Sequence, residues 1–217
     1  MKRADKAKDD YGTISRVYHL VDVVLEGCRN GMTRALQRRE LSRVLDVGCG
    51  TGTQVVKLRA AGLRAVGIDI SAAMLCRARA RERAGTSSFV LGDALRLPFP
   101  DQAFDALVFS FALHEKPHPQ RLAMLAEGRR VLNSGGLVVV LDYVRPNDRR
   151  ARLAAGFLAC IERMAGRVHY RAFRDYMQRG AADGVLTAAG LRLMSRTLWL
   201  QGTVGLFEGR WETPSSG

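Results

Sequence analysis

Three glycines alternate in the run Gly48-Cys49-Gly50-Thr51-Gly52, which follows an apolar stretch and precedes a helix-forming stretch that begins at Thr53. Such a turn lets the backbone approach a ligand closely, and its amides together with a helix N-terminus favour an anionic group. The dinucleotide-binding pattern GxGxxG would need a glycine at position 53, where threonine stands. The pattern is instead DxGxGxG from Asp46, which alone also fits a tight turn in an unrelated α/β protein.

Two further acids follow the next two β-rich runs. Asp69 ends the second run about twenty residues beyond the glycine turn, where a carboxylate can accept both hydroxyls of a ribose. Asp93 follows the third run and suits the edge of an adenine, because its carboxylate can accept from the exocyclic amine. A dinucleotide enzyme has no systematic need for this second acid. Acids at three successive strand ends therefore predict one adenosyl-binding site on one rim of a sheet.

A histidine stands close to this rim. His114 lies in the run SFALHE (110–115), immediately after the fourth β-rich run, and imidazole titrates in the range useful for proton transfer. It is our candidate for a catalytic base; the alternative is that it shapes the pocket or bonds Glu115. His169 and Tyr170 are second candidates that could reach in from a cap, or else are surface and packing residues.

The elements that must position these residues alternate between short β-rich runs and helical segments, as in a parallel sheet covered on both faces. Several runs are continuous in valine, leucine and isoleucine, as expected of strands buried on both faces. We predict strands at Arg43–Val47, Ala65–Ile70, Ser87–Leu91, Ala106–Ser110 and Leu137–Asp142. We predict helices at Thr53–Ala61, Ala72–Ala84 and Gln120–Leu132, the second capped by Ser71.

Three regions flank this alternation. Tyr11–Leu36 is predicted as an amphipathic helix over the carboxyl ends of the strands, and Leu191–Thr197 with Gln201–Phe207 as an antiparallel pair. Arg149–Arg167 is predicted as a helix with one buried face. Its apolar stripe comprises Leu153, Phe157, Cys160, Ile161 and Met164. We expect a single domain over 1–217, with an N-terminal helical lid (1–40) and a helical cap (145–185).

Composition limits the other classes of protein. The formal net charge is +13, enough to attract polyanions or anionic lipid, although many arginines fit ordinary exposed helix positions. The four cysteines lie far apart, which argues against disulfides and structural zinc, and we predict no metal site. A charged N-terminus and the lack of a long apolar run predict a cytoplasmic protein.

Taken together, four segments resemble class I S-adenosylmethionine-dependent methyltransferases of the type 11 group. They are LDVGCGTG, VGIDIS with Met74, GDALRLPFPDQAFD and EGRRVLNSGGLVVVLDY, and the resemblance is strong over residues 40–145. The group includes ubiquinone/menaquinone-biosynthesis C-methyltransferases and bacterial phospholipid N-methyltransferases. The resemblance implies a doubly wound, Rossmann-like α/β fold, a seven-stranded sheet of order 3-2-1-4-5-7-6, and an antiparallel strand 7.

The resemblance also implies which residues contact S-adenosylmethionine, which would leave as S-adenosylhomocysteine. Residues of the glycine loop would hold its methionyl part, two apolar residues would sandwich the adenine, and a tyrosine of the N-terminal lid would cover it. The implied set is Tyr18, Asp46, Gly48, Cys49, Gly50, Asp69, Ile70, Met74, Asp93, Ala94 and Ser110. The family has no universal catalytic residue, because the sulfonium carries its own activation.

The acceptor of the methyl group is left open between several classes. A small or amphipathic molecule, such as a quinol precursor or a phospholipid headgroup, fits an arginine-flanked apolar helix that rests peripherally on an anionic membrane. An RNA acceptor is disfavoured, because neither an NPPY-type tetrapeptide nor a Pro-Cys pair follows the fourth strand. The third possibility is a non-catalytic regulator that binds the cofactor. The oligomeric state is unknown.

Overall fold

The computed structural model describes residues 25–39, 41–82 and 87–212, apart from the side chain of Phe157. The proposed lid tyrosine, Tyr18, and most of the predicted N-terminal helix lie outside the described residues. Within the described residues, no helix combines the length and the apolar character that a membrane span requires.

The centre of the molecule is one seven-stranded sheet of order β3-β2-β1-β4-β5-β7-β6. The first five strands are parallel, and β7 runs antiparallel to both β5 and β6. This confirms the fold, including the strand order that the resemblance implied. The strands are β1 (Arg43–Val47), β2 (Arg64–Asp69), β3 (Phe89–Leu91), β4 (Phe104–Ser110), β5 (Leu132–Tyr143), β6 (Leu191–Trp199) and β7 (Val204–Trp211).

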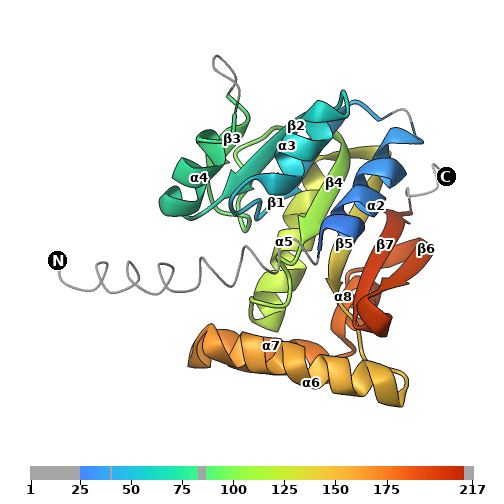
Figure 1. Cartoon of the computed structure of the whole chain (residues 1–217). Helices are drawn as coiled ribbons and strands as arrows, with labels where there is room; N and C mark the ends of the chain where they lie inside the picture. The colour runs from blue at the N-terminus through green and yellow to red at the C-terminus, as the bar shows by residue number, and fades with distance from the viewer. Residues whose placement is uncertain (1–24, 40, 83–86, 213–217) are drawn as a thin grey trace.

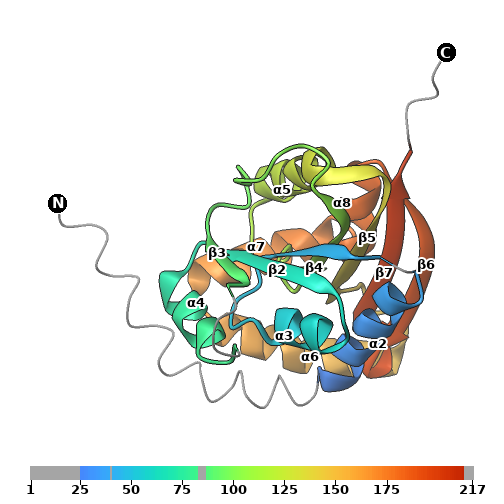
Figure 2. The ribbon, with the colours of Figure 1, turned by 90° about the horizontal axis from the view of Figure 1, so that it is seen from above.

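Helices cover both faces of the sheet, as the alternating pattern predicted. Figure 2 shows α2 (Glu26–Gln37), α3 (Thr53–Ala60) and α4 (Ala72–Arg79) on one face, and α5 (His118–Val131) and α8 (Ala181–Ala188) on the other. Ser71 caps α4 as predicted, because its side chain accepts a hydrogen bond from the amide of Met74. The central strands are buried on both faces, which explains their continuous apolar runs.

The position predicted for the N-terminal helix is wrong for the part that the structure describes. Helix α2 lies on a face of the sheet rather than over its carboxyl edge (Figure 1). Its Gly31 packs so closely against Trp199 that a Cβ there would lie 3.0 Å from the indole ring. Small residues on this helix therefore fix it against the end of β6, beside the short helix η2 (Leu200–Gly202).

Two helices, α6 (Arg149–Met164) and α7 (Arg167–Gln178), form a cap beneath the carboxyl ends of the strands (Figure 1). The side chain of Asp148 caps α6 by accepting from the amide of Ala151 at 2.7 Å. Gly166, with a φ of 113°, separates the two helices. Helix α6 thus ends three residues before the predicted boundary.

The buried face predicted for α6 is wrong. Leu153 and Met164 of the predicted stripe are 79% and 70% exposed, and Cys160 is also exposed. The buried side of the helix instead carries Ala151 and Glu162. Ile161 of the predicted stripe is half-buried, as is Leu158. The cause is the place of α6 in a layer that covers only the strand ends, where it buries a narrow side of the helix.

Candidate active site

The glycine loop after β1 has the geometry that its sequence predicted. Gly48, Gly50 and Gly52 have φ angles of 75°, 53° and 74°, which side chains with a Cβ rarely adopt. The amides of Gly48 and Cys49 both donate to the carbonyl of Ile68, at 2.9 and 3.0 Å. A Cβ at Gly50 would meet nothing within 4 Å. The loop is therefore open above Gly50, as the approach of a ligand requires.

Asp69, at the end of β2, ties this loop to the start of α4. Its carboxylate accepts from the amide of Gly50 and from the amide of Ser71, both at 2.8 Å. Each carboxylate oxygen keeps further acceptor capacity, so the same group can still bind hydroxyls. Next to it, Ile70 is 65% exposed and Met74 is half-buried. An exposed isoleucine at a strand end suits an apolar ligand surface such as the face of a base.

Asp46 is buried at the end of β1, and its Oδ1 has no hydrogen-bond partner among the described residues. Burial is the main cause that raises its pKa to about 7, and the nearby charge of Asp69 adds to it, while Arg29 opposes the shift. A buried carboxylate oxygen without a donor suits a ligand that carries a positive group. The methionyl ammonium of S-adenosylmethionine is such a group, so this site fits the cofactor that the sequence implied.

The remaining cofactor candidates lie along the same rim. Asp93 is exposed after β3 and accepts from the amide of Leu95 at 2.9 Å, and Ala94 and Ser110 are half-buried. The thiol of Cys49 points inward, since a Cβ at Gly67 would lie 2.7 Å from its Sγ. Burial raises the pKa of this thiol, so the side chain of Cys49 stays protonated.

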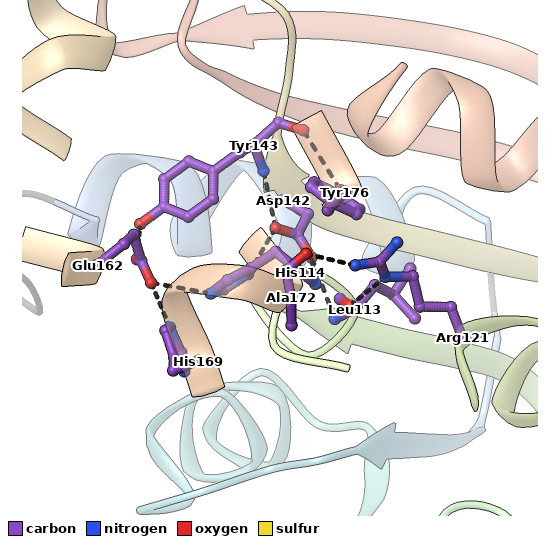
Figure 3. Close-up of polar contacts among 9 residues, drawn as sticks. All are labelled: Leu113, His114, Arg121, Asp142, Tyr143, Glu162, His169, Ala172 and Tyr176. Carbon is purple, nitrogen blue, oxygen red and sulfur yellow. Dashed lines mark hydrogen bonds and ion pairs between the residues drawn. The ribbon is translucent and has the colours of Figure 1, made fainter. Parts of the chain in front are cut away.

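His114 is buried beyond the end of β4, close to the glycine loop. Its Nδ1 lies 2.8 Å from Oδ1 of Asp142, at the end of β5 (Figure 3). The other oxygen of Asp142 accepts from the amides of Leu113 and His114 at 3.2 and 3.4 Å. The partner of the imidazole is thus Asp142 and not Glu115. The preceding Ala112 places this loop against the glycine turn, because a Cβ at Gly48 would lie 3.0 Å from that of Ala112.

A second imidazole–carboxylate pair comes from the cap. Nε2 of His169 on α7 contacts Oε2 of Glu162 on α6, and Tyr143 donates its hydroxyl to Oε1 of Glu162 at 2.7 Å (Figure 3). The same Oε2 lies 3.7 Å from Nε2 of His114. The centroids of the two imidazole rings are 5.6 Å apart. The structure therefore brings His114 and His169 together around one buried carboxylate.

These carboxylates change the proton affinity of His114. Burial lowers its pKa, but the carboxylate of Asp142 outweighs burial and, with Glu162 and Glu115, raises the pKa of His114 to about 9. The pKa of Glu162 is lowered instead: burial raises it, but the hydrogen bond from His169 and the charge of His114 shift it further down. The cluster thus holds an imidazolium against ionised carboxylates at neutral pH.

Aromatic rings enclose this cluster. The ring centroid of Tyr143 lies 4.8 Å from that of His114, and the centroids of Phe111, Phe173 and Tyr176 lie 6.2 to 6.3 Å away. His114 is 3% exposed, so the cap is closed over it. The surroundings combine flat apolar walls with two imidazole–carboxylate pairs.

One group of side chains has the chemistry of metal ligands. Donor atoms of His114, Glu115 and His169 all lie within 4.8 Å of one another. However, Asp142 already faces one nitrogen of His114, and Glu162 faces a nitrogen of each ring. We therefore interpret the cluster as one that shares protons.

Sequence reasoning missed Asp142, Glu162 and Arg121. Asp142 had a usable signal, because an acid that ends a wholly apolar strand must find a partner at the strand's carboxyl end. Glu162 lies one helical turn after Leu158 of α6, and an acid at this spacing from an apolar residue could have marked the side of the helix that is buried. Arg121 gave no signal among the many other arginines.

Comparisons with known proteins agree with this geometry. A family model described as a methyltransferase domain matches residues 44–136. The chain is 35% identical over 153 residues to the demethylmenaquinone methyltransferase of Renibacterium salmoninarum, covering 67% of this chain and 62% of the relative. It is 34% identical over 160 residues to that of Mycolicibacterium vanbaalenii, covering 69% and 68%.

In the first of these relatives the matched region is thus less than two thirds of the protein. A solved structure of an S-adenosylmethionine-dependent methyltransferase from Aquifex aeolicus matches with a TM-score of 0.55 at 18% identity, over 81% of this chain and 87% of that one. This likeness concerns the fold. With the strand order, the glycine loop and the sequence relatives in agreement, the chain belongs to the class I S-adenosylmethionine-dependent methyltransferases.

Proposed function

We propose that this protein methylates a small hydroxylated aromatic acceptor of the quinol type. The observation that carries the proposal is the buried His114–Asp142 pair, which aromatic rings enclose. His114 lies in the loop after β4, and β4 is the neighbour of β1, the strand that leads into the glycine turn. Relatives named demethylmenaquinone methyltransferase support an acceptor of this class.

The cofactor S-adenosylmethionine supplies a methyl group bonded to a positively charged sulfur. Asp46 suits its ammonium group, because its buried Oδ1 lacks a donor among the described residues. Asp69 retains acceptor capacity for the ribose hydroxyls, and Ile70 offers an exposed apolar surface to the base. The further residues that we assign to this site are Tyr18, Gly48, Cys49, Gly50, Met74, Asp93, Ala94 and Ser110.

His114 is the proposed base. Asp142 fixes Nδ1 of the ring, which leaves Nε2 as the nitrogen that receives a proton from the acceptor. The carboxylates around the ring raise the pKa of His114 to about 9. The base form of His114 is therefore a minor species at neutral pH. A phenolic hydroxyl, with a pKa of about 10, is the acceptor that such a base deprotonates more readily than an aliphatic alcohol or an RNA hydroxyl.

Aromatic side chains give the acceptor its place. Phe111 and Tyr143, with centroids 5.4 Å apart, and Phe173 at 5.5 Å from Tyr143, form walls that suit a flat ring. Because His114 is buried beneath α6 and α7, the cap must move for the acceptor to enter. Closure then excludes water from the reacting atoms.

We further propose that α6 rests on an anionic membrane, where amphipathic acceptors partition. Its outward side carries the exposed Leu153 and Met164, and Val168 at the start of α7 is 83% exposed. The exposed Arg149, Arg150 and Arg152 in its first turn supply charge for anionic headgroups.

The acceptor class is tested with cofactor that carries a ¹³C methyl group. The protein is incubated with reduced 2-methyl-1,4-naphthoquinol, phosphatidylethanolamine vesicles, RNA, or no acceptor. Labelled methyl should appear on a ring carbon of the naphthoquinol alone. Label on lipid or on RNA would identify that molecule as the acceptor and contradict the proposal. Cofactor binding without any transfer would favour a non-catalytic regulator.

The cofactor site is tested with Asp69→Ala. Calorimetric affinity for S-adenosylhomocysteine should fall by at least about tenfold, because hydrogen bonds to a charged acceptor contribute about 1.5–3 kcal/mol each. Asp105→Ala is the matched control: Asp105 also accepts a backbone amide, from Arg43, but at the opposite rim of the sheet. Equal affinity in the Asp69 variant and the parent would contradict the ribose assignment.

A further inference from the structure

A hydroxylated ring that is methylated at carbon through its phenolate gives up two protons in turn, and one of them later returns to the oxygen. The phenolic proton leaves before attack, because the phenolate is the stronger carbon nucleophile. The ring carbon then forms a bond to the methyl group with an electron pair of the ring, and the methyl–sulfur bond breaks with its pair on sulfur. The methylated carbon finally loses its own proton, and the C–H pair restores the aromatic ring. If His114 holds the first proton, the second needs another acceptor.

We propose that the His169–Glu162 pair of the cap is this second proton acceptor. The inference rests on the proposed function, since only methylation at carbon requires it. His169 takes the proton from the ring carbon, and Glu162 holds the imidazole and balances its charge. His114 returns its proton to the phenolate oxygen of the product. One turnover therefore releases one proton to solvent, the one that His169 took from the ring carbon.

The two imidazoles come from different parts of the fold and meet at the carboxylate of Glu162. His114 and Asp142 come from the carboxyl ends of β4 and β5, whereas Glu162 and His169 come from α6 and α7. The rings meet edge to face with centroids 5.6 Å apart, close enough for both to reach one bound ring. Tyr143 contacts both pairs, because its hydroxyl bonds Glu162 and its ring packs on His114.

Burial and access differ between the pairs in the way that the two roles require. The side chain of His114 is 4% exposed, which suits a base that must return its proton to the product. The side chain of His169 is 19% exposed and lies at the margin of the cap, where it can pass a proton to water. If Glu162 and His169 formed a purely structural ion pair, there would be no need for the imidazole of His114 to face the same carboxylate.

The test uses naphthoquinol that carries either hydrogen or deuterium at the ring carbon that is methylated. In the parent, both forms should react at the same rate, because proton loss follows a slower methyl transfer. In His169→Asn and in Glu162→Gln, kcat should fall about a hundredfold. The deuterated acceptor should then react more slowly than the protonated one, because loss of the ring proton has become limiting.

Controls separate this outcome from a damaged cap. Arg171→Gln and Arg163→Gln change exposed neighbours in the same helices and should leave the rate and the isotope insensitivity of the parent unchanged. Thermal midpoints and calorimetric affinity for S-adenosylhomocysteine report whether the variants are folded. A lower kcat without an isotope effect would reduce the pair to a structural role and overturn the inference, while the proposed function would stand.

A second readout does not depend on turnover. In protein with ¹⁵N-labelled histidine, Glu162→Gln should change the chemical shift of Nε2 of His169, because this nitrogen contacts the carboxylate of Glu162. An unchanged chemical shift would show that the two side chains do not act as a pair. If the parent transfers no methyl group to naphthoquinol while it binds cofactor, the proposed function and this inference both fail.

Discussion

Arg121 of α5 donates a 2.6 Å hydrogen bond from Nη2 to the backbone carbonyl of Ala172 in α7. The same guanidinium, which is fully buried, donates to the carbonyl of Leu113 at 3.1 Å and to the carboxylate of Asp175 at 2.8 Å. One side chain thus joins the loop that carries His114 to the cap that covers it. The closed cap and the orientation of the imidazole depend on the same contact.

Arg121→Met should therefore lower the free energy of unfolding by about 3 kcal/mol, because two buried carbonyls and a carboxylate lose their donor. Urea denaturation measures the change. The matched control is Arg179→Gln, which removes another arginine that bonds Asp175, at 2.7 Å, but is itself exposed. That substitution should cost less than about 1 kcal/mol. Equal losses in the two variants would show that Arg121 does not anchor the cap.

Most of the fold could be predicted from the sequence, because local patterns determine it. Strand β1 has the predicted bounds, and α3 differs by one residue, since apolar runs and the glycine turn mark their ends. The order of the strands came from the resemblance, because long-range pairing leaves no local pattern. Strand β5 runs to Tyr143, one residue beyond its predicted end, and begins five residues earlier than predicted, since Leu132 pairs with Phe104 ahead of the glycines.

The rim of the site could also be predicted, because parallel strands place their carboxyl ends together. Asp46, Asp69 and Asp93 lie at successive strand ends, as expected. The partners of His114 could not be predicted, since Glu162 and His169 reach it through the packing of two cap helices. That packing buries Glu162 of α6, which accepts a hydrogen bond from Tyr143, and leaves Leu153 and Met164 of the predicted apolar stripe exposed.

The rate of methyl transfer should rise with pH and level off above about 9. The base form of His114 is the active one, and the pKa of the imidazolium is raised to about 9, so lower pH leaves it protonated. The groups that face the ring are Asp142 from β5, Glu115 from its own loop, Glu162 from α6, His169 from α7, and Tyr143 and Tyr176.

Asp142→Asn should move this pH profile to lower values, because it removes the carboxylate that most favours the imidazolium. Glu127→Gln, which changes a carboxylate bonded to Arg130, should leave the profile unchanged. Rates of label transfer from pH 6 to 10 measure both. A profile that is the same in the Asp142 variant and the parent would remove His114 from the role of base.

Asp46 should make both stability and cofactor affinity depend on pH near 7. Its folded-state pKa is raised from 3.8 to about 7, so its contribution to stability is largest below pH 3.8 and is lost as pH rises through about 7. The stability of the parent relative to Asp46→Asn should therefore fall between pH 5 and 8, by on the order of 1 kcal/mol or more.

Affinity for S-adenosylmethionine should change in the opposite direction, because the ionised carboxylate binds the ammonium group. Calorimetry should show tighter binding to the parent as pH rises through about 7, and weak, pH-independent binding to Asp46→Asn. Asp105→Asn is the control, since that carboxylate already pairs with Arg43. Stability that responds to pH identically in parent and variant would show that Asp46 is not the titrating group.

Removal of metal ions should leave activity unchanged. His114, Glu115 and His169 have the donor atoms of a metal site, but Asp142 and Glu162 already hold the imidazoles in proton-sharing pairs. Dialysis against EDTA should thus alter neither methyl transfer nor the thermal midpoint. Loss of activity that Zn²⁺ or Mn²⁺ restores would assign this cluster to a metal instead.

The exposed arginines at the start of α6 should govern binding to anionic membranes. Changing all three to glutamine should reduce cosedimentation with phosphatidylglycerol vesicles by about two orders of magnitude in partition coefficient, since each basic residue near such a surface contributes about 1 kcal/mol. Binding of the parent should weaken with salt and be low on phosphatidylcholine.

A control that alters net charge equally, at exposed arginines far from the cap, should bind as the parent does. The variant carries Arg149→Gln, Arg150→Gln and Arg152→Gln; the control carries Arg77→Gln, Arg96→Gln and Arg192→Gln. Equal sedimentation of parent and variant would contradict a membrane-facing α6, and an equal loss in the control would mean that net charge alone drives binding.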